Sequence, residues 1–233
     1  LINKRNMLNM DAISVLSSAI QKNLSESKLN SNYNIMNMLN QFNKKMKFSR
    51  NIISFNDLKD WKIKKNSVSD IKKKFFSIFF IDVFANLREV KKWEQPIISD
   101  HSSSLNGFLV SKINNTMHYL LKIIIEPGFD KSKYTSTIFE KNFSLNSRKN
   151  IKFLSFFNKK NCSMDIINSD EGGRFLKNQT RNMICEIKDH NKINLYDNFV
   201  WASHNQVVEL INQNKMTIEA RNLFASCNVD KIK

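Results

Sequence analysis

From about residue 75 onward the chain consists of short apolar runs typical of β-strands, and this feature constrains its fold most. FFSIFFIDVF, residues 75–84, is an apolar run rich in Phe and Ile. REVKKWEQPIIS continues it after a turn at residues 85–87. NGFLVSKI and TMHYLLKIIIE have the pattern of a hairpin that turns at NNT, residues 114–116. These runs predict a mostly antiparallel sheet.

Two further strands are expected in the second half of the chain. KNIKFLSFF, residues 149–157, is one candidate. RNMICEIKD is the other, because Met183, Cys185 and Ile187 alternate with polar neighbours as in a half-buried strand.

Helical spacing of apolar residues occurs at both ends of the chain. The first fifty residues contain no Gly or Pro, and SNYN at residues 31–34 separates two apolar stripes. Near the end, WASHNQVVELINQ predicts a helix capped by Ser203, and TIEARNLFAS adds a last helical turn or two. We therefore expect an α+β fold, with a curved, mostly antiparallel or mixed sheet flanked by helices. The two stripes are Leu8, Met10, Ile13, Leu16, Ile20 and Leu24, and then Ile35, Leu39, Phe42 and Met46.

The charge does not by itself indicate nucleic-acid binding. Lys and Arg number 37 against 21 Asp and Glu, a net charge of +16 at pH 7. The lysines lie in short runs among Asn and Ser, as an A/T-rich coding sequence produces on any solvated surface. None forms a long block or a stripe interleaved with aromatic residues. We expect no nucleic-acid partner, while a positive surface would suit a smaller phosphorylated ligand.

Membrane and metal sites are not expected either. No apolar run approaches the roughly 20 residues needed to span a bilayer, and Asn, Lys, Arg and Asp interrupt the N-terminal stretch where a signal peptide would be apolar. Cys162, Cys185 and Cys227 are scattered without CxxC spacing, which predicts reduced thiols, a cytoplasmic setting and no zinc site. The four histidines are isolated, so no metal is expected. G-x-G-x-x-G, P-loop and G-x-S-x-G motifs are missing, and no dinucleotide cofactor is expected.

What remains is a set of polar clusters at strand ends, and each has two interpretations. In EPGF the Pro-Gly pair makes a turn at which Glu126 either caps the backbone or acts as a rigidly held base. In DEGGRF the glycines permit a turn with positive backbone angles, which is either merely solvated or brings amides and Arg174 to an anion. Arg181 follows seven residues later, and two arginines suit a diphosphate. Trp93 and Trp201 are either core residues or stacking groups for a base or sugar.

Taken in order, these clusters resemble the NDP-hexose 2,3-dehydratase family of deoxysugar biosynthesis. The resemblance covers most of residues 56–226. Its elements are NDLKDWKI, FFSIFFIDV, REVKKWEQPII, GFLVSKINNTMHYLLKIIIEPG, DEGGRFLKNQTRNMI and NFVWASHNQVVELINQNKMTIEARNLFAS. They are weak singly and specific as an ordered set. The resemblance implies a Nudix-like domain over residues 51–233, preceded by a helical segment over residues 1–50.

The resemblance also implies a lyase that removes water across C2 and C3 of an NDP-4-keto-6-deoxyhexose, with dTDP the expected nucleotide. The C4 ketone acidifies the C3 hydrogen, so a positioned base can remove that proton, and an acid then helps the C2 hydroxyl to leave. Tautomerisation gives a 3,4-diketo-2,6-dideoxy sugar, and no cofactor is needed. The expected catalytic residues are Glu126 and His204. The expected substrate-binding residues are Trp93, Gln95, Lys122, Glu171, Arg174, Arg181, Asn182 and Trp201.

A second interpretation stays open. A non-catalytic module that binds a nucleotide sugar, or supports a partner dehydratase, would keep the same clusters. Two stretches depart from the family's usual pattern: Ile124 stands where many members carry a polar residue, and the segment around Thr137 differs as well. The binding module is favoured if these positions face the sugar rather than the core. Members of the family commonly carry two such modules in tandem. With one module here, a homodimer or pairing with a homologous chain is expected.

Overall fold

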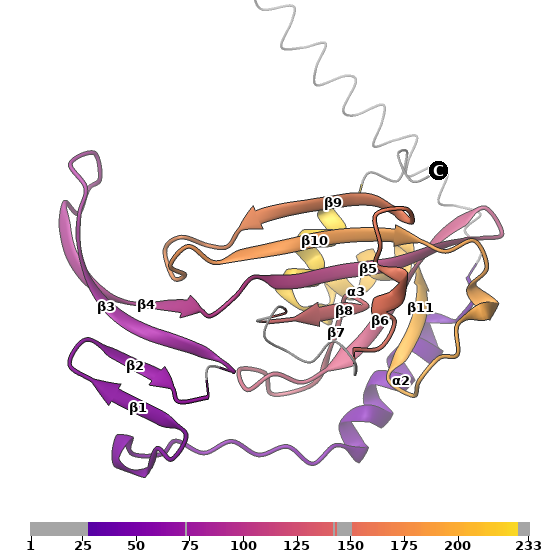
Figure 1. Ribbon diagram of the computed structural model, residues 1–233. Helices are drawn as coiled ribbons and strands as arrows, with labels where there is room; N and C mark the ends of the chain where they lie inside the picture. Colours follow the sequence, from indigo (N-terminus) through magenta and orange to yellow (C-terminus); the bar gives the residue numbers. More distant parts are fainter. Residues whose placement is uncertain (1–27, 73, 142, 144–150, 228–233) are drawn as a thin grey trace, which may run out of the picture.

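The computed structural model describes residues 28–72, 74–141, 143 and 151–227 (Figure 1). The first expected apolar stripe, residues 8–24, lies outside the described residues. The elements are α2 (Asn32–Lys45), η2 (Phe55–Asp57), β1 (Trp61–Lys64), β2 (Ser67–Asp70), β3 (Phe76–Phe84), β4 (Lys92–Asp100), β5 (Ser104–Ile113), β6 (Thr116–Ile124), β7 (Lys133–Thr135), β8 (Ile138–Glu140), η4 (Leu154–Phe156), β9 (Cys162–Ser169), β10 (Gln179–Glu186), η5 (His190–Lys192), β11 (Phe199–Ser203), α3 (His204–Asn212) and α4 (Ile218–Ala225).

The strands form two sheets. The larger has the order β11-β6-β5-β10-β9, with β7 added on β6 and β8 on β5. Its pairs are antiparallel except β5 with β10, which run parallel, so the sheet is mixed. The smaller sheet is the antiparallel series β1-β2-β3-β4. The expected α+β class is confirmed.

The larger sheet is covered on both faces. One face packs on α2, α3 and α4, where Ile35, Tyr119 and Val207 belong to a single buried cluster. The other face carries a second cluster around Leu109, Leu120 and Trp201. Because β5 lies between two neighbours and under both layers, nearly all of its residues are buried. Burying both faces of a sheet is the main apolar contribution to the stability of such a fold.

The predicted hairpin and the end helices are confirmed. Asn114 and Asn115 have φ of 48° and 60°, the left-handed values that a two-residue hairpin turn requires and that Asn tolerates. Helix α2 contains the second apolar stripe, with Ile35 and Leu39 buried. Helix α3 begins directly after Ser203, whose N–H donates to the side-chain oxygen of Gln206 at 3.0 Å. No helix among the described residues is long and apolar enough to cross a membrane.

The strand expected at residues 149–157 is wrong. Residues 154–156 form the single 3-10 turn η4, and Phe153 before it has a left-handed φ of 65°. Phe153, Phe156 and Phe157 pack on the second buried cluster instead of pairing with a strand. The run is apolar because it covers a sheet face, and apolar content alone does not distinguish a cover from a strand.

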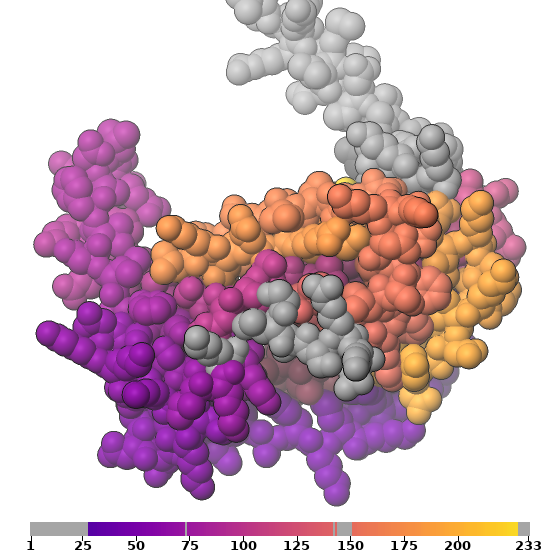
Figure 2. Space-filling model, in the orientation of Figure 1, coloured from indigo at the N-terminus to yellow at the C-terminus, as the bar shows by residue number. Residues whose placement is uncertain are grey.

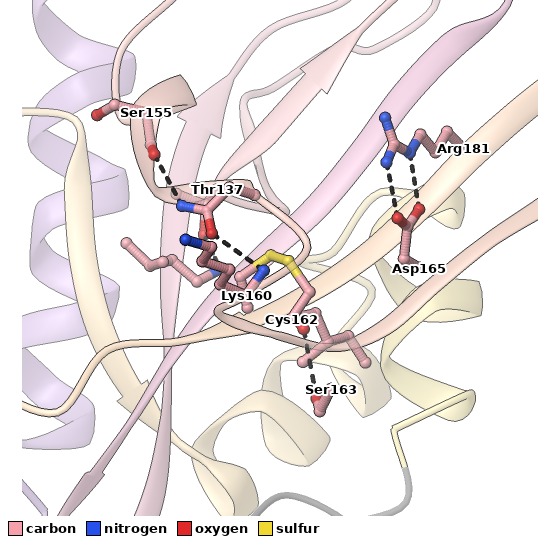
Figure 3. The surroundings of a disulfide bond; sticks show 11 residues. Thr137, Ser155, Lys160, Cys162, Ser163, Asp165 and Arg181 are labelled. Carbon is pink, nitrogen blue, oxygen red and sulfur yellow. Dashed lines mark hydrogen bonds and ion pairs between the residues drawn. A yellow bond between two sulfur atoms is a disulfide. The ribbon is translucent and has the colours of Figure 1, made fainter.

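The expectation of reduced thiols is wrong for two of the three cysteines. Cys162 on β9 and Cys185 on β10 form a disulfide across these antiparallel neighbours, while Cys227 is free (Figure 3). The two residues are 23 positions apart, and only strand pairing places them opposite each other. A cysteine count gives no information about such pairing.

The ends of β3 and β4 project from the body as a two-stranded arm, residues 80–96 (Figures 1 and 2). β2 pairs with β3 only as far as Phe79, so beyond that point β3 has β4 as its partner. Four large apolar side chains of the arm are exposed: Phe80 at 70%, Phe84 at 73%, Leu87 at 94% and Val90 at 62%. Such a ribbon is marginal in water without a further packing surface.

Candidate functional site

A cavity of about 260 Å³ lies where the ends of several elements meet. Asn106 and Asn182 line it from near the starts of the parallel strands β5 and β10. The end of β9, the end of β4 and the first turn of α4 complete the wall. Its lining residues are Asp100, Ser104, Asn106, Phe139, Lys141, Asn168, Ser169, Asp170, Glu171, Phe175, Thr180, Asn182, Ile218, Glu219 and Asn222.

A network of amides fixes the floor of this cavity. The Nδ2 of Asn106 donates to the Oδ1 of Asn182 at 3.1 Å and to the backbone oxygen of Glu219 at 3.0 Å. Its own Oδ1 accepts from the hydroxyl of Ser136 at 2.6 Å. Asn106 is only 2% exposed, so these bonds are made away from bulk water and hold β5, β10 and α4 in register.

Several carboxyl groups in or near the cavity interact electrostatically with Lys141. Burial raises the pKa of Asp100, Lys141 opposes that rise and Asp170 adds to it. Burial also raises the pKa of Glu126, the charge of Glu219 adds to the rise, and Lys141 again opposes it. A half-buried carboxyl with a raised pKa keeps its proton to a higher pH than an exposed one does, which suits a general acid.

Glu219 is the least satisfied of these groups. Its Oε2 is buried and has no hydrogen-bond partner among the described residues. A buried carboxylate oxygen without a partner costs free energy that a bound hydroxyl group would recover. The lining is thus suited to a neutral polyol: carboxyl and amide groups can bind hydroxyls, and Phe139 and Phe175 offer apolar contacts.

The clusters WEQP and DEGGRF meet beside this cavity. The Nε2 of Gln95 donates to the backbone oxygen of Gly173 at 2.6 Å, and its Oε1 accepts from the Nε1 of Trp93 at 2.7 Å. Arg174 pairs with Glu171 at 2.9 Å on the surface of the same turn. The turn joins the small sheet to the large one, because Ile98 on β4 bonds the backbone on both sides of Phe175.

The turn is not built as expected from its glycines. No glycine in the described chain has a positive φ, and the left-handed residue of this segment is Lys177, with φ of 56°. Gly172 and Gly173 have nothing within 4 Å of the position a Cβ would take. The prediction of positive glycine angles is therefore wrong.

Several predicted site residues lie away from the cavity. Arg181 points to β9, where it donates two hydrogen bonds of 2.7 Å to Asp165 (Figure 3). Lys122 lines a separate cavity of about 170 Å³. Trp201 is 1% exposed within the second buried cluster. His204 lies in the helical layer, its Nδ1 3.3 Å from the hydroxyl of Tyr119.

The structure therefore brings Glu171 and Asn182 into one cavity. Glu126 is electrostatically coupled to its residues Glu219 and Lys141, and Arg174 pairs with Glu171. Trp93 and Gln95 are linked by hydrogen bonds to the turn that contains Glu171. Most of the lining residues were not expected from the sequence, among them Asp100, Asn106, Lys141 and Glu219. Asp100 directly follows the segment REVKKWEQPIIS, and Glu219 lies within TIEARNLFAS. They are recognised as candidate site residues only because the fold places them in the same cavity.

The sequence of this chain matches one protein family and several known proteins. The NDP-hexose 2,3-dehydratase family profile matches residues 32–227. The chain is 24% identical over 189 residues to a dTDP-4-dehydro-6-deoxy-alpha-D-glucopyranose 2,3-dehydratase of Saccharopolyspora spinosa, covering 77% of this chain and 38% of that protein. A protein of the same name from Amycolatopsis orientalis is 24% identical over 132 residues, covering 54% and 28%. The chain thus spans about a third of the length of the curated relatives it matches.

Two solved structures show a similar arrangement at low identity. A C. elegans Ap4A hydrolase has a TM-score of 0.34 and 9% identity, covering 53% of this chain and 93% of its own. An ADP compounds hydrolase has a TM-score of 0.39 and 10% identity, covering 72% and 92%. Both TM-scores are below 0.5, and nothing about the chemistry of this chain follows from these structures. Since the family profile spans most of the described residues, the chain belongs to the NDP-hexose 2,3-dehydratase family.

Proposed function

We propose that this protein removes water across C2 and C3 of an NDP-4-keto-6-deoxyhexose, with dTDP as the nucleotide. The observation that carries the proposal is the cavity in which Asp100 and Glu219 line the wall, with Lys141 beside them and Glu126 within electrostatic reach. Carboxyl groups in a partly desolvated site supply the acid and the base that this elimination needs.

The size and charge of the cavity favour the hexose end of the substrate. At about 260 Å³ it is just below the roughly 300–1,000 Å³ of pockets that enclose a whole drug-sized ligand. Four carboxyl-bearing residues line the cavity against one lysine, Lys141, so its interior does not suit a diphosphate. They are Asp100, Asp170, Glu171 and Glu219. The diphosphate then belongs at the rim, where Arg174 is exposed and Trp93 and Gln95 lie on the facing strand.

The alternative of a non-catalytic binding module depends on where the altered positions point. Thr137 is 1% exposed, donates to the backbone oxygen of Leu120, and accepts from the N–H of Leu109 at 2.8 Å. It therefore has a structural role between strands and does not take a polar group away from the sugar. Ile124 is half-buried at the end of β6, opposite Lys133. We accordingly favour the enzyme over the binding module.

We further propose that two modules act together, as a homodimer or with a homologous chain. The exposed Phe80, Phe84, Leu87 and Val90 of the arm give it an apolar surface for association. The cysteine pattern no longer supports the expected cytoplasmic setting, because Cys162 and Cys185 form a disulfide.

Mass spectrometry of the purified protein with a dTDP-4-keto-6-deoxyhexose tests the activity, in the presence of a 3-ketoreductase that traps the unstable diketone. A product lighter by one water and carrying two added hydrogens is expected. If the substrate returns unchanged while the protein still binds dTDP, the binding module is the correct interpretation. Sedimentation of the same preparation tests the pairing.

A further inference from the structure

We propose that Glu219 is the base that takes the C3 proton and that Asp100 is the acid that protonates the departing C2 oxygen. The inference rests on the proposed dehydratase activity. In this assignment the residues that contact the sugar are Glu219 and Asp100, which line the cavity, in place of Glu126 and His204.

Glu219 has the position and the unsatisfied oxygen that a base requires. It lies in the first turn of α4, where the helix N-terminus favours a negative charge, and Thr217 caps that turn. The backbone oxygen of Glu219 is held by Asn106, which fixes the residue against the floor of the cavity. Its Oε2 is buried without a hydrogen-bond partner among the described residues, so one carboxylate oxygen is left for a ligand.

Asp100 suits the acid role for the opposite reason. It ends β4 at the junction between the two sheets, where its backbone N–H donates to the Oδ1 of Asn178 at 3.0 Å. Burial raises the pKa of its carboxyl, and the nearby Asp170 raises it further against the effect of Lys141. Such a group retains its proton at a pH where an exposed aspartate is ionised.

Glu126 acts on Glu219 through its charge. It does not line the cavity, yet burial raises the pKa of its carboxyl and the charge of Glu219 adds to that rise. Because Glu126 is electrostatically coupled to Glu219 without lining the cavity, we assign Glu126 a positioning role.

The proton transfers balance over one turnover. Glu219 takes the proton from C3, the C2–O bond breaks, and the proton of Asp100 leaves with that oxygen as water. The resulting C3 enol gives its hydroxyl proton to Asp100, and Glu219 returns its proton to C2. Both carboxyls recover their starting states, and the sugar has lost one water.

Two variants separate the roles when the substrate is incubated in D2O and its C3 signal is followed by proton NMR. Glu219→Gln should lose both C3 exchange and product, with kcat lower by about 10²–10⁴-fold. Asp100→Asn should lose product formation to a similar extent but retain C3 exchange. Glu126→Gln should dehydrate within about tenfold of wild type, with a displaced pH profile.

The control is Glu186→Gln, a half-buried carboxyl at the far end of β10 with a pKa likewise raised by burial. It should dehydrate at the wild-type rate. Thermal melting and dTDP binding of each variant establish that it is folded. Exchange at C3 in Glu219→Gln, or normal turnover in Asp100→Asn, would overturn the inference alone. Wild type that binds dTDP but neither exchanges nor dehydrates overturns the proposed function, and the inference with it.

Discussion

Arg181 and Asp165 form a two-pronged ion pair between adjacent strands. The Nε of Arg181 donates to one carboxylate oxygen and its Nη2 to the other, both at 2.7 Å. A guanidinium whose fork is occupied in this way has its best donors committed within the protein. Of the two arginines expected to bind the diphosphate, Arg181 is therefore held to β9, while Arg174 pairs with Glu171 of its own turn.

Replacing Asp165 by Asn should weaken folding more than nucleotide binding. Hydrogen bonds from Arg181 lower the pKa of Asp165 below its usual value, so the pair stabilises the fold at neutral pH. That stability is present above the unfolded pKa, roughly 3.9, and is lost as pH falls through the lower folded value. The loss in Asp165→Asn at pH 7 should be at most about 1 kcal/mol, because Arg181 is 39% exposed.

Urea unfolding of wild type and Asp165→Asn between pH 7 and pH 2 measures this effect, and the two curves should converge at the acid end. Titration with dTDP provides the second measurement. A large loss of dTDP affinity in Arg181→Lys, with stability unchanged, would show that Arg181 serves the ligand and not the strands.

The spacing of apolar residues predicted much of the fold, because residues that are buried in a strand or helix recur at a regular interval along the sequence. The hairpin turn at Asn114 and Asn115 is determined by which residues tolerate a left-handed backbone. The cap at Ser203 is likewise a local signal. Residues 154–156 were mistaken for part of a strand because a segment that covers a sheet is as apolar as one that pairs in it.

The site was less predictable than the fold. Glu171 and Asn182 were found because they lie in a recognised segment, and both line the cavity. Asp100 and Glu219 are 119 residues apart in sequence and line the same cavity only because β4 ends where α4 begins. A single sequence contains no signal for such a meeting.

Reduction of the disulfide should destabilise the protein by about 3 kcal/mol. Cys162 and Cys185 are 23 residues apart, and a cross-link that closes a loop of this length restricts the unfolded chain by roughly that amount. Chemical denaturation with and without dithiothreitol measures the difference on one sequence. Cys227→Ser is the matched control, since Cys227 is free and its variant should show the same sensitivity to reduction. Equal stability in both conditions would contradict the prediction.

Gly107→Ala should destabilise the fold by about 1–3 kcal/mol. Gly107 lies on β5, and an added Cβ would overlap the ring of Phe157, which covers that sheet face. Gly128→Ala is the control, because nothing lies within 4 Å of its Cβ position and its φ is not positive. Urea midpoints should fall for the first variant and stay within about 0.5 kcal/mol for the second. No change at Gly107 would mean that Phe157 moves aside at little cost.

Lys141→Met should shift the pH dependence of both activity and stability. Lys141 lowers the pKa of Asp100 and of Glu126, which burial raises, so its removal lets both values rise further. A carboxyl with a raised folded pKa stabilises the fold most at low pH, and that contribution declines as pH rises from the unfolded to the folded pKa.

In Lys141→Met this decline should therefore extend to higher pH than in wild type. If Asp100 must hold a proton for turnover, the alkaline limb of the kcat profile should move up in the same variant. Lys112→Met, on the same sheet but near Glu186, is the control and should leave that limb in place. An alkaline limb that stays fixed in Lys141→Met while the melting profile moves would show that another group supplies the proton.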